Sequence, residues 1–326
     1  MKRALITGIT GQDGAYLAQF LLEKGYEVFG LIRRTSSPNF WRLDYFGIKD
    51  RIHFLEGDLL DTESLNLAVS TAQPDEVYNL AAQSFVGTSW KQAVLTTEVN
   101  ALGVTRILNA VKHFAPKAKF YQASTSEMYG NSHLNGKQDE NTPLHPRSPY
   151  AISKLYGHWI TINYRESFDM FTCSGILFNH ESPLRGIEFV TRKISDGVAR
   201  IKHGIASELR LGNLDSKRDW GFSGDYVQAM WLMLQQNQPE DFVISTGINH
   251  SVTDFCEAAF QSAGIQNWKQ YVVIDQAFIR PAELNFLLGM SNKAREKLGW
   301  QPKKTFEQLV DMMVKTDLDR LSHYKK

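Results

Sequence analysis

Residues 4–14 read ALITGITGQDG, in which a short apolar run meets three glycines in the spacing G-x-x-G-x-x-G. The apolar run is typical of a buried strand, and a helix is predicted from Ala15 to Lys24, ending before Gly25. Glycines suit such a turn because backbone amides at a helix N-terminus can then approach a diphosphate without a Cβ in the way. The stretch therefore predicts a dinucleotide-binding turn, with a plain structural turn as the alternative.

Outside this stretch, strand-like and helix-like segments alternate along the chain. Short β-rich runs lie at residues 28–32, 52–55, 77–80 and 120–123, and residues 97–114 carry apolar positions at helical spacing. Strands separated by helices predict right-handed βαβ units. We therefore expect an α/β fold with a Rossmann-like, doubly wound parallel sheet.

The second half of the chain predicts a smaller domain. The alternation weakens from about residue 179 to 220 and resumes with a helix at 225–236 and a strand at 242–244. A final helix is expected to begin at Thr305, because Gln308 completes a capping box. We expect a nucleotide-binding Rossmann domain from residues 1–178 plus about 221–250, and a discontinuous α/β substrate-binding domain from about 179–220 plus 251–326.

The composition excludes several classes of protein. Of 326 residues, 43% are hydrophobic and 22% charged, which is typical of a folded globular chain. The 36 lysines and arginines balance 35 acidic residues, so we expect no nucleic acid or membrane partner. Cys173 and Cys256 cannot form a disulfide framework, which favours a cytoplasmic location. We also expect no signal peptide, no membrane span and no catalytic metal.

Arg33 and Arg34 follow the second predicted strand, where an NAD-binding protein usually offers an acidic residue to the ribose. A carboxylate there would repel a 2′-phosphate, whereas a guanidinium pairs with it, so we expect NADP. Two solvated surface arginines are the alternative. By their order in the fold, the expected cofactor contacts are Gly8, Thr10, Gly11, Gln12, Asp13, Gly14, Arg33, Asp58, Leu59, Leu80, Ala81, Ala82, Gln83 and Ser84.

Tyr150 and Lys154 are four residues apart and share one face of a predicted helix that Ser148 and Pro149 would start. We expect the ammonium and the positive helix end to lower the pKa of Tyr150, so that its phenolate can remove a hydroxyl proton during hydride transfer. The Y-x-x-x-K pattern is common by chance. It becomes a catalytic candidate because it follows the glycine turn.

Thr125 and Glu127 follow the fifth predicted strand, at the edge of the sheet where ligands bind in open α/β folds. We expect Thr125 to donate a hydrogen bond to the substrate and Glu127 to act as an acid or base besides Tyr150. A second base implies a second proton transfer on the substrate. A glutamate that merely caps a loop is the alternative.

The glycine turn, residues 125–127 and the Tyr150–Lys154 pair together resemble the extended short-chain dehydrogenase/reductases. Further runs resemble the GDP-mannose 4,6-dehydratases in particular, and the likeness extends from the first strand to residue 300. These runs are NHESPLRG at 179–186, FVTRKI at 189–194, LGN at 211–213, RDWG at 218–221 and RPAE at 280–283.

The resemblance implies a lyase that keeps NADP tightly bound and converts GDP-mannose to GDP-4-dehydro-6-deoxy-mannose and water, by internal hydride transfer from C4 to C6. In it, Tyr150 takes the O4 proton, and Glu127 removes the C5 proton and assists loss of the C6 hydroxyl. Tyr150, Lys154, His180 and Arg185 join the cofactor contacts. The resemblance also implies a homo-oligomer and the GDP-sugar contacts Ser84, Ser126, Asn179, Val190, Lys193, Leu211, Asn213, Arg218, Arg280 and Glu283.

The chain departs from the family pattern at three places. Phe85 stands where many relatives have His, Leu284-Asn285 replaces Val-Asp, and residues 221–224 lack a His after the glycine. The second departure leaves open whether the sugar is mannose or a related manno-configured sugar. A nucleotide-sugar epimerase or 4-reductase is the alternative enzyme, although neither needs Glu127. A redox-sensing NADP-binding regulator is the alternative from another class, although it would not need the Tyr150–Lys154 pair.

Overall fold

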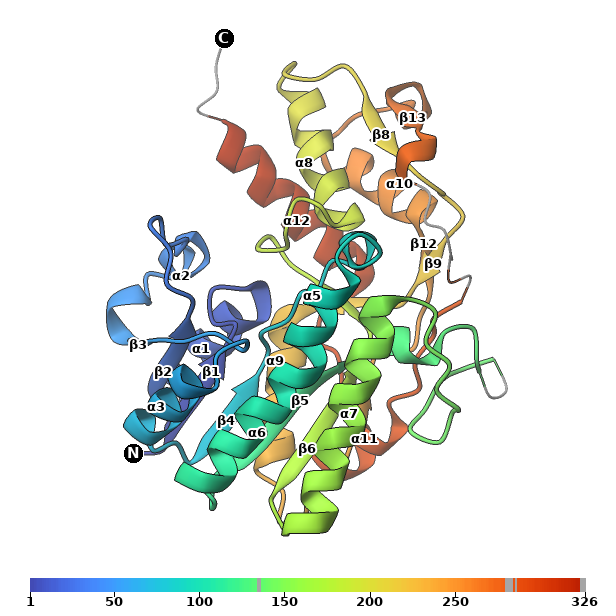
Figure 1. Ribbon diagram of the computed structural model, residues 1–326. Helices are drawn as coiled ribbons and strands as arrows, with labels where there is room; N and C mark the ends of the chain where they lie inside the picture. The colour runs from blue at the N-terminus through green and yellow to red at the C-terminus, as the bar shows by residue number, and fades with distance from the viewer. Residues whose placement is uncertain (134–135, 279–283, 285, 323–326) are drawn as a thin grey trace.

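The computed structural model describes residues 1–133, 136–278, 284 and 286–322. Its centre is a seven-stranded sheet in the order β3-β2-β1-β4-β5-β6-β11, with every neighbouring pair parallel (Figure 1). This arrangement confirms the predicted Rossmann-like α/β fold. The strands are β1 (Arg3–Thr7), β2 (Glu27–Ile32), β3 (His53–Glu56), β4 (Glu76–Asn79), β5 (Lys119–Thr125), β6 (Thr172–Leu177) and β11 (Phe242–Ile244).

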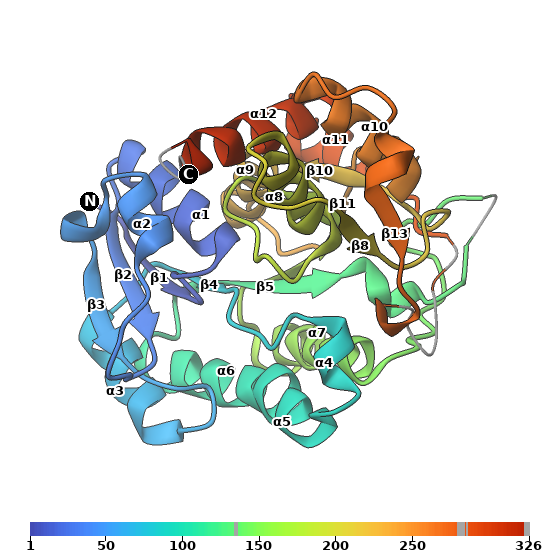
Figure 2. The same cartoon turned by 90° about the horizontal axis from the view of Figure 1, so that it is seen from above.

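Helices cover both faces of the sheet, because crossover connections between parallel strands place them there. Figure 2 shows α1 (Gln12–Glu23) and α9 (Ser223–Leu234) on one face. On the other face lie α3 (Thr62–Ala72), α6 (Gly103–Phe114) and α7 (Pro149–Phe168). Each face has its own apolar core, and the core of the first also includes residues of α11 (Asn292–Leu298).

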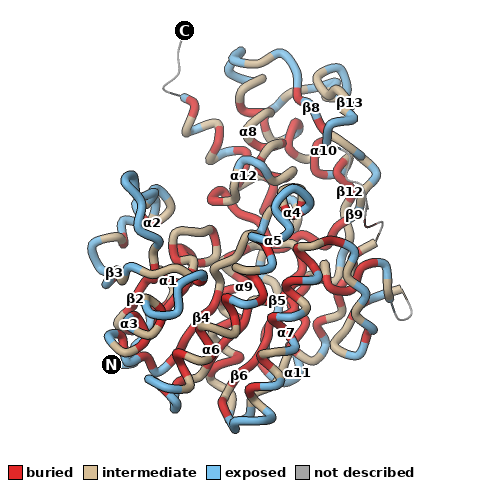
Figure 3. The backbone as a smooth tube through the Cα atoms, in the orientation of Figure 1, coloured by how far each residue is buried: buried red, intermediate tan, exposed pale blue. Residues whose placement is uncertain are grey.

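A second lobe stands at one end of the sheet (Figure 1). Its own apolar core joins residues of three helices, and Figure 3 shows buried residues running through both lobes. The helices are α8 (Val190–Lys202), α10 (Val252–Ser262) and α12 (Phe306–Leu321). Three two-stranded pairs complete the lobe and its junction with the sheet: β7 (Asn179–Glu181) with β10 (Trp220–Phe222), β9 (Lys217–Arg218) with β12 (His250–Ser251), and β8 (Leu209–Leu211) with β13 (Val272–Ile274).

The expected helix at residues 97–114 is longer and less regular than its pattern suggested. It begins as α5 (Ala93–Thr97), passes through a π-helical turn at Glu98–Leu102 and continues as α6. The two predicted helix starts are confirmed: Ser148 accepts a hydrogen bond from the Ala151 amide, and Thr305 forms a capping box with Gln308. Short helices that were not expected are α2 (Trp41–Tyr45) and α4 (Val86–Ser89), with 3-10 turns at Lys49–Arg51, Ser126–Tyr129, Trp268–Tyr271 and Gln276–Phe278.

Within the described ranges, none of the helices combines the length and the apolar character needed to cross a bilayer.

Candidate active site

The glycine turn lies between the carboxyl ends of β1 and β4, where the strand order of the sheet reverses. Gly8 has φ +71°, and a Cβ there would lie 2.8 Å from the backbone nitrogen of Ala81. A Cβ on Gly14 would collide with the carbonyl oxygen of Gly8. Glycine is thus required both by the left-handed backbone and by the close approach of the two strand ends.

A cavity of about 520 Å³ surrounds this turn. The structure brings together around it the predicted residues Gly8, Thr10, Gly11, Gln12, Asp13, Gly14, Arg33, Asp58, Leu59, Leu80, Ala81, Ala82, Gln83, Ser84 and Arg185. Sequence reasoning missed Leu31, Ile32, Gly57, Leu60, Leu95 and Val99, which also line it. Three of the predicted cofactor contacts are not among the described residues that line the cavity: Tyr150, Lys154 and His180.

A buried chain of hydrogen bonds leads from the turn to Lys154. The Thr7 hydroxyl donates to Asn79 Oδ1 (2.7 Å) and accepts from the two backbone amides just after β4. Asn79 Nδ2 donates to Gln122 Oε1 (2.8 Å), and Gln122 Nε2 donates to the Ala123 carbonyl (3.1 Å). Lys154 Nζ donates to the same carbonyl. The ammonium is therefore held against β5 by a network that crosses three strands.

Tyr150 and Lys154 are both buried, as the shared helix face allows. Burial raises the pKa of Tyr150 to about 12, and it lowers the pKa of Lys154 to about 8. A hydrogen bond with Thr125 opposes the shift of the phenol, whereas the charge of Glu127 adds to it. The expected lowering of the Tyr150 pKa is therefore wrong for the protein groups by themselves. Desolvation of a phenolate outweighs the helix end, and the Lys154 ammonium is bound at Ala123.

His180 reaches the glycine turn through Asp13. Its Nε2 lies 2.8 Å from Asp13 Oδ2, its Nδ1 lies 2.7 Å from the Phe178 carbonyl oxygen, and its ring stacks on Tyr226. Burial by itself would lower the pKa of His180, but the charge of Asp13 raises it overall. Asp13 also accepts a hydrogen bond from Ser223 (2.8 Å). The first turn of α1 is thus tied to β7 and α9.

Arg185 extends into the cavity from the loop after β7. Its Nε lies 3.1 Å from Glu181 Oε2, and its guanidinium carbon lies 3.6 Å from the centre of the Phe189 ring. Phe189 in turn packs edge-on against Phe85, one of the residues at which the chain departs from the family pattern. Phe85 therefore helps to place a cation at the cavity.

The expected GDP-sugar contacts are spread over the second lobe and its junction with the sheet. Lys193 Nζ lies 3.1 Å from the centre of the Phe278 ring, and the buried Arg218 donates to the Leu284 carbonyl (2.9 Å). Leu211 lies on β8. Four further expected contacts lie at the ends of elements: Ser126 begins the turn after β5, Asn179 begins β7, Val190 begins α8, and Asn213 lies just after β8. Arg280 and Glu283 fall outside the described residues.

Solved structures with this fold include UDP-glucose 4-epimerase from Thermotoga maritima with UDP-glucose, at a TM-score of 0.87 and 24% identity over 98% of this chain and 99% of that one. DesIV, a dTDP-glucose 4,6-dehydratase from Streptomyces venezuelae with NAD and TYD bound, reaches 0.86 and 24% identity over 99% of both chains. At these identities the likeness shows the fold alone.

Sequence comparison is more specific. The family model described as GDP-mannose 4,6 dehydratase matches residues 5–313. The chain is 52% identical to GDP-mannose 4,6 dehydratase 2 of Arabidopsis thaliana, covering 98% of this chain and 87% of the relative. It is 48% identical to GDP-mannose 4,6 dehydratase of Homo sapiens, covering 97% and 91%. The chain belongs to the GDP-mannose 4,6-dehydratase family.

Proposed function

We propose that this protein is a hydro-lyase that converts GDP-mannose to GDP-4-dehydro-6-deoxy-mannose and water. The observation that carries the proposal is the cluster at the end of β5, where Thr125 hydrogen-bonds with Tyr150 and the charge of Glu127 acts on the same phenol. Two acid–base groups at one site suit a reaction that moves two different protons of its substrate. The names of the relatives point to the same substrate.

The residues around the glycine turn fit a nicotinamide dinucleotide. Gly8 and Gly14 keep the turn tight, because a Cβ on either would collide with neighbouring backbone. The turn opens a helix N-terminus, and Arg33 and Arg185 add positive charge. These groups would hold the phosphates and riboses, with Lys154 and His180 supporting them from outside the cavity lining. When bound, the nicotinamide accepts a hydride from the sugar and returns it, so the reaction has no net redox change.

The protein's own groups account for the protons. Two protons leave the sugar, one from O4 to Tyr150 and one from C5 to Glu127. One of them departs in the water formed from the C6 hydroxyl, and the other is used when C5 is protonated again. Thr125 orients the phenol through its hydrogen bond. Because burial raises the pKa of Tyr150, its phenolate is a strong base for the O4 proton, and the phenol must release a proton again before the cycle closes.

The cofactor in this proposal is NADP. Structures of the same fold include one with NAD and one, RMD from Pseudomonas aeruginosa, with NADPH, so the fold does not decide the cofactor. Arg33 lines the cavity and Arg34 does not occur in its described lining. Wild-type protein denatured with acid should release NADP, and Arg33→Asp should weaken NADP binding more than NAD binding. Arg34→Asp is the matched control, and release of NAD from the wild-type protein would contradict the proposal.

The experiment that tests the reaction is incubation with GDP-mannose and no added cofactor, followed by mass spectrometry of the nucleotide sugar. Loss of one water is the expected result. An epimerase would leave the mass unchanged, a 4-reductase would need stoichiometric NADPH, and a regulator would leave the sugar unaltered. Each of these outcomes would contradict the dehydratase proposal and favour the corresponding alternative.

We further propose that residues 1–178 with about 221–250 bind NADP, and that about 179–220 with 251–326 bind the GDP-sugar. The separate apolar core of the second lobe supports this division.

We also propose a cytoplasmic location. It is supported by the two cysteines, which are buried as free thiols and whose pKa values burial raises. Homo-oligomer formation is also proposed.

A further inference from the structure

Residues 182–185 form a short segment between β7 and α8, here called the strap. Its last residue, Arg185, lines the cofactor cavity. Its first residue, Ser182, donates to Gln12 Oε1 in the glycine turn (2.7 Å) and accepts a hydrogen bond from the Leu184 amide (3.1 Å). The strap therefore connects the glycine turn with a cation that lines the same cavity.

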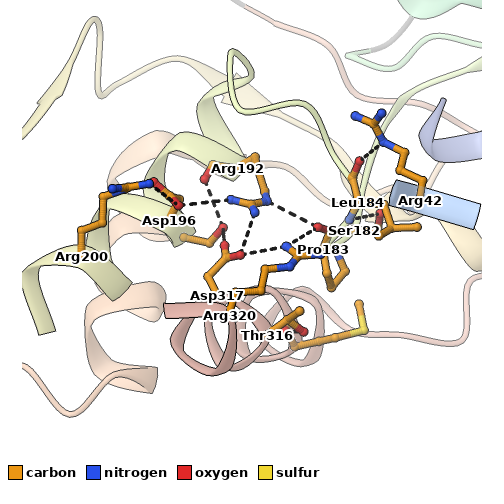
Figure 4. A network of polar contacts seen from close by, with 12 residues as sticks. Arg42, Ser182, Pro183, Leu184, Arg192, Asp196, Arg200, Thr316, Asp317 and Arg320 are labelled. Atoms are coloured by element: carbon orange, nitrogen blue, oxygen red, sulfur yellow. Dashed lines mark hydrogen bonds and ion pairs between the residues drawn. The ribbon is translucent and has the colours of Figure 1, made fainter. Parts of the chain in front are cut away.

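Arginines from three helices bind the carbonyls of the strap (Figure 4). Arg320 of α12 donates to the Pro183 carbonyl (2.7 Å), and Arg192 of α8 lies 3.4 Å from the same oxygen. Arg42 of α2 donates through Nε to the Leu184 carbonyl (2.7 Å). These bonds fix the backbone just before Arg185.

Arg42 makes a second bond, from Nη1 to the carbonyl of Thr10 in the glycine turn (3.2 Å). Thr10 itself lines the cavity. One guanidinium thus binds both the turn and the strap through two different nitrogens, Nε and Nη1, which its planar fork holds in a fixed relative geometry. The Trp41 ring lies 4.5 Å from the guanidinium carbon of Arg42 and 5.4 Å from that of Arg320.

We propose that Arg42 is a positioning residue for the cofactor site. By holding Thr10 and Leu184 at once, it sets the distance between the glycine turn and Arg185, both of which offer the cavity groups suited to phosphates. The proposal rests on the proposed function, because it assumes that a nicotinamide dinucleotide occupies this cavity.

The test compares NADPH binding by wild type, Arg42→Met and Arg320→Met, measured by cofactor fluorescence after bound nucleotide has been removed. Arg42→Met should raise the Kd by about 10-fold or more, a loss like the ~10–100-fold that follows removal of groups orienting metal ligands. Arg320→Met removes a strap contact without touching the glycine turn, so its Kd should rise by less than that of Arg42→Met. At saturating NADP, kcat of Arg42→Met should remain close to wild type.

Arg42→Lys keeps the charge but lacks the rigid two-nitrogen fork, and it serves as the test variant if Arg42→Met folds poorly. It should weaken NADPH binding while leaving the unfolding temperature near that of wild type. No loss of NADPH affinity in either Arg42 variant, or an equal loss in Arg320→Met and Arg42→Met, would overturn the bridging role. If the wild-type protein itself fails to bind NADPH, the proposed function fails instead.

Discussion

At the scale of single residues, the roles of Tyr150 and Glu127 follow from the order of the steps, since only a ketone at C4 makes the C5 proton removable. Glu127→Gln should permit oxidation at C4 but stall elimination, with turnover reduced by about 10²–10⁴-fold. The variant should accumulate one equivalent of reduced nicotinamide, visible in its near-ultraviolet absorbance. Tyr150→Phe should show neither this absorbance nor exchange of the C5 hydrogen with solvent deuterium. Turnover of Glu127→Gln within a few-fold of wild type would favour the epimerase or reductase.

Lys154 should make the stability of the protein depend on pH. Its folded pKa of about 8 lies below its ordinary value of 10.5, so the unfolded chain binds the proton more tightly. The free energy of unfolding should therefore increase as pH rises from about 7 to 9, by about 1 kcal/mol from this group. Urea unfolding of wild type and Lys154→Met at both pH values measures it. An equal pH response in the two proteins would show that Lys154 does not cause it.

At the scale of elements, sequence patterns predicted the features that depend on residues close together in the chain, such as strands and helix caps. The six expected strands, the Ser148 cap and the Thr305 capping box depend on periodicity and on contacts within a few residues. The position of Leu95 in the cavity wall and the bonds of Arg42 to the strap and the glycine turn depend on segments that are distant in sequence. No local signal marks them. The pKa of Tyr150 was misjudged for the same reason, because its burial is a tertiary property.

The docking of α12 on α8 gives a prediction at this scale. Asp317 is buried and accepts from Ser195 Oγ (2.6 Å), and it forms ion pairs with Arg192 (2.8 Å) and Arg320 (2.9 Å) (Figure 4). Asp317→Asn should lower the free energy of unfolding by about 3 kcal/mol, because the buried Arg192 loses its nearer countercharge and keeps the more distant Asp196 (3.8 Å). The exposed Asp319 on the same helix is the control, and Asp319→Asn should change stability by less than about 0.5 kcal/mol. Denaturant unfolding that gives equal values for both variants would contradict the role of Asp317.

At the scale of the whole molecule, the outer sides of α5 and α7 leave apolar side chains exposed. Ile152 and Trp159 on α7 are each 56% exposed, and Val94 on α5 is 79% exposed. The two helices lie side by side on one face of the molecule (Figure 1). Exposed apolar side chains on two neighbouring helices favour association with a second copy of the chain. We therefore expect paired helices from two subunits to form a four-helix interface.

Light scattering at micromolar concentration should then give at least the mass of a dimer for the wild-type protein. Ile152→Glu combined with Trp159→Glu should shift it to the monomer, because each copy would place two unpaired carboxylates in the interface. Ile205 is also partly exposed but lies on the second lobe, so Ile205→Glu should keep the wild-type mass. Circular dichroism of the double variant separates loss of pairing from loss of folding. A wild-type monomer, or a double variant that still dimerises, would show that this face of α7 is not the interface.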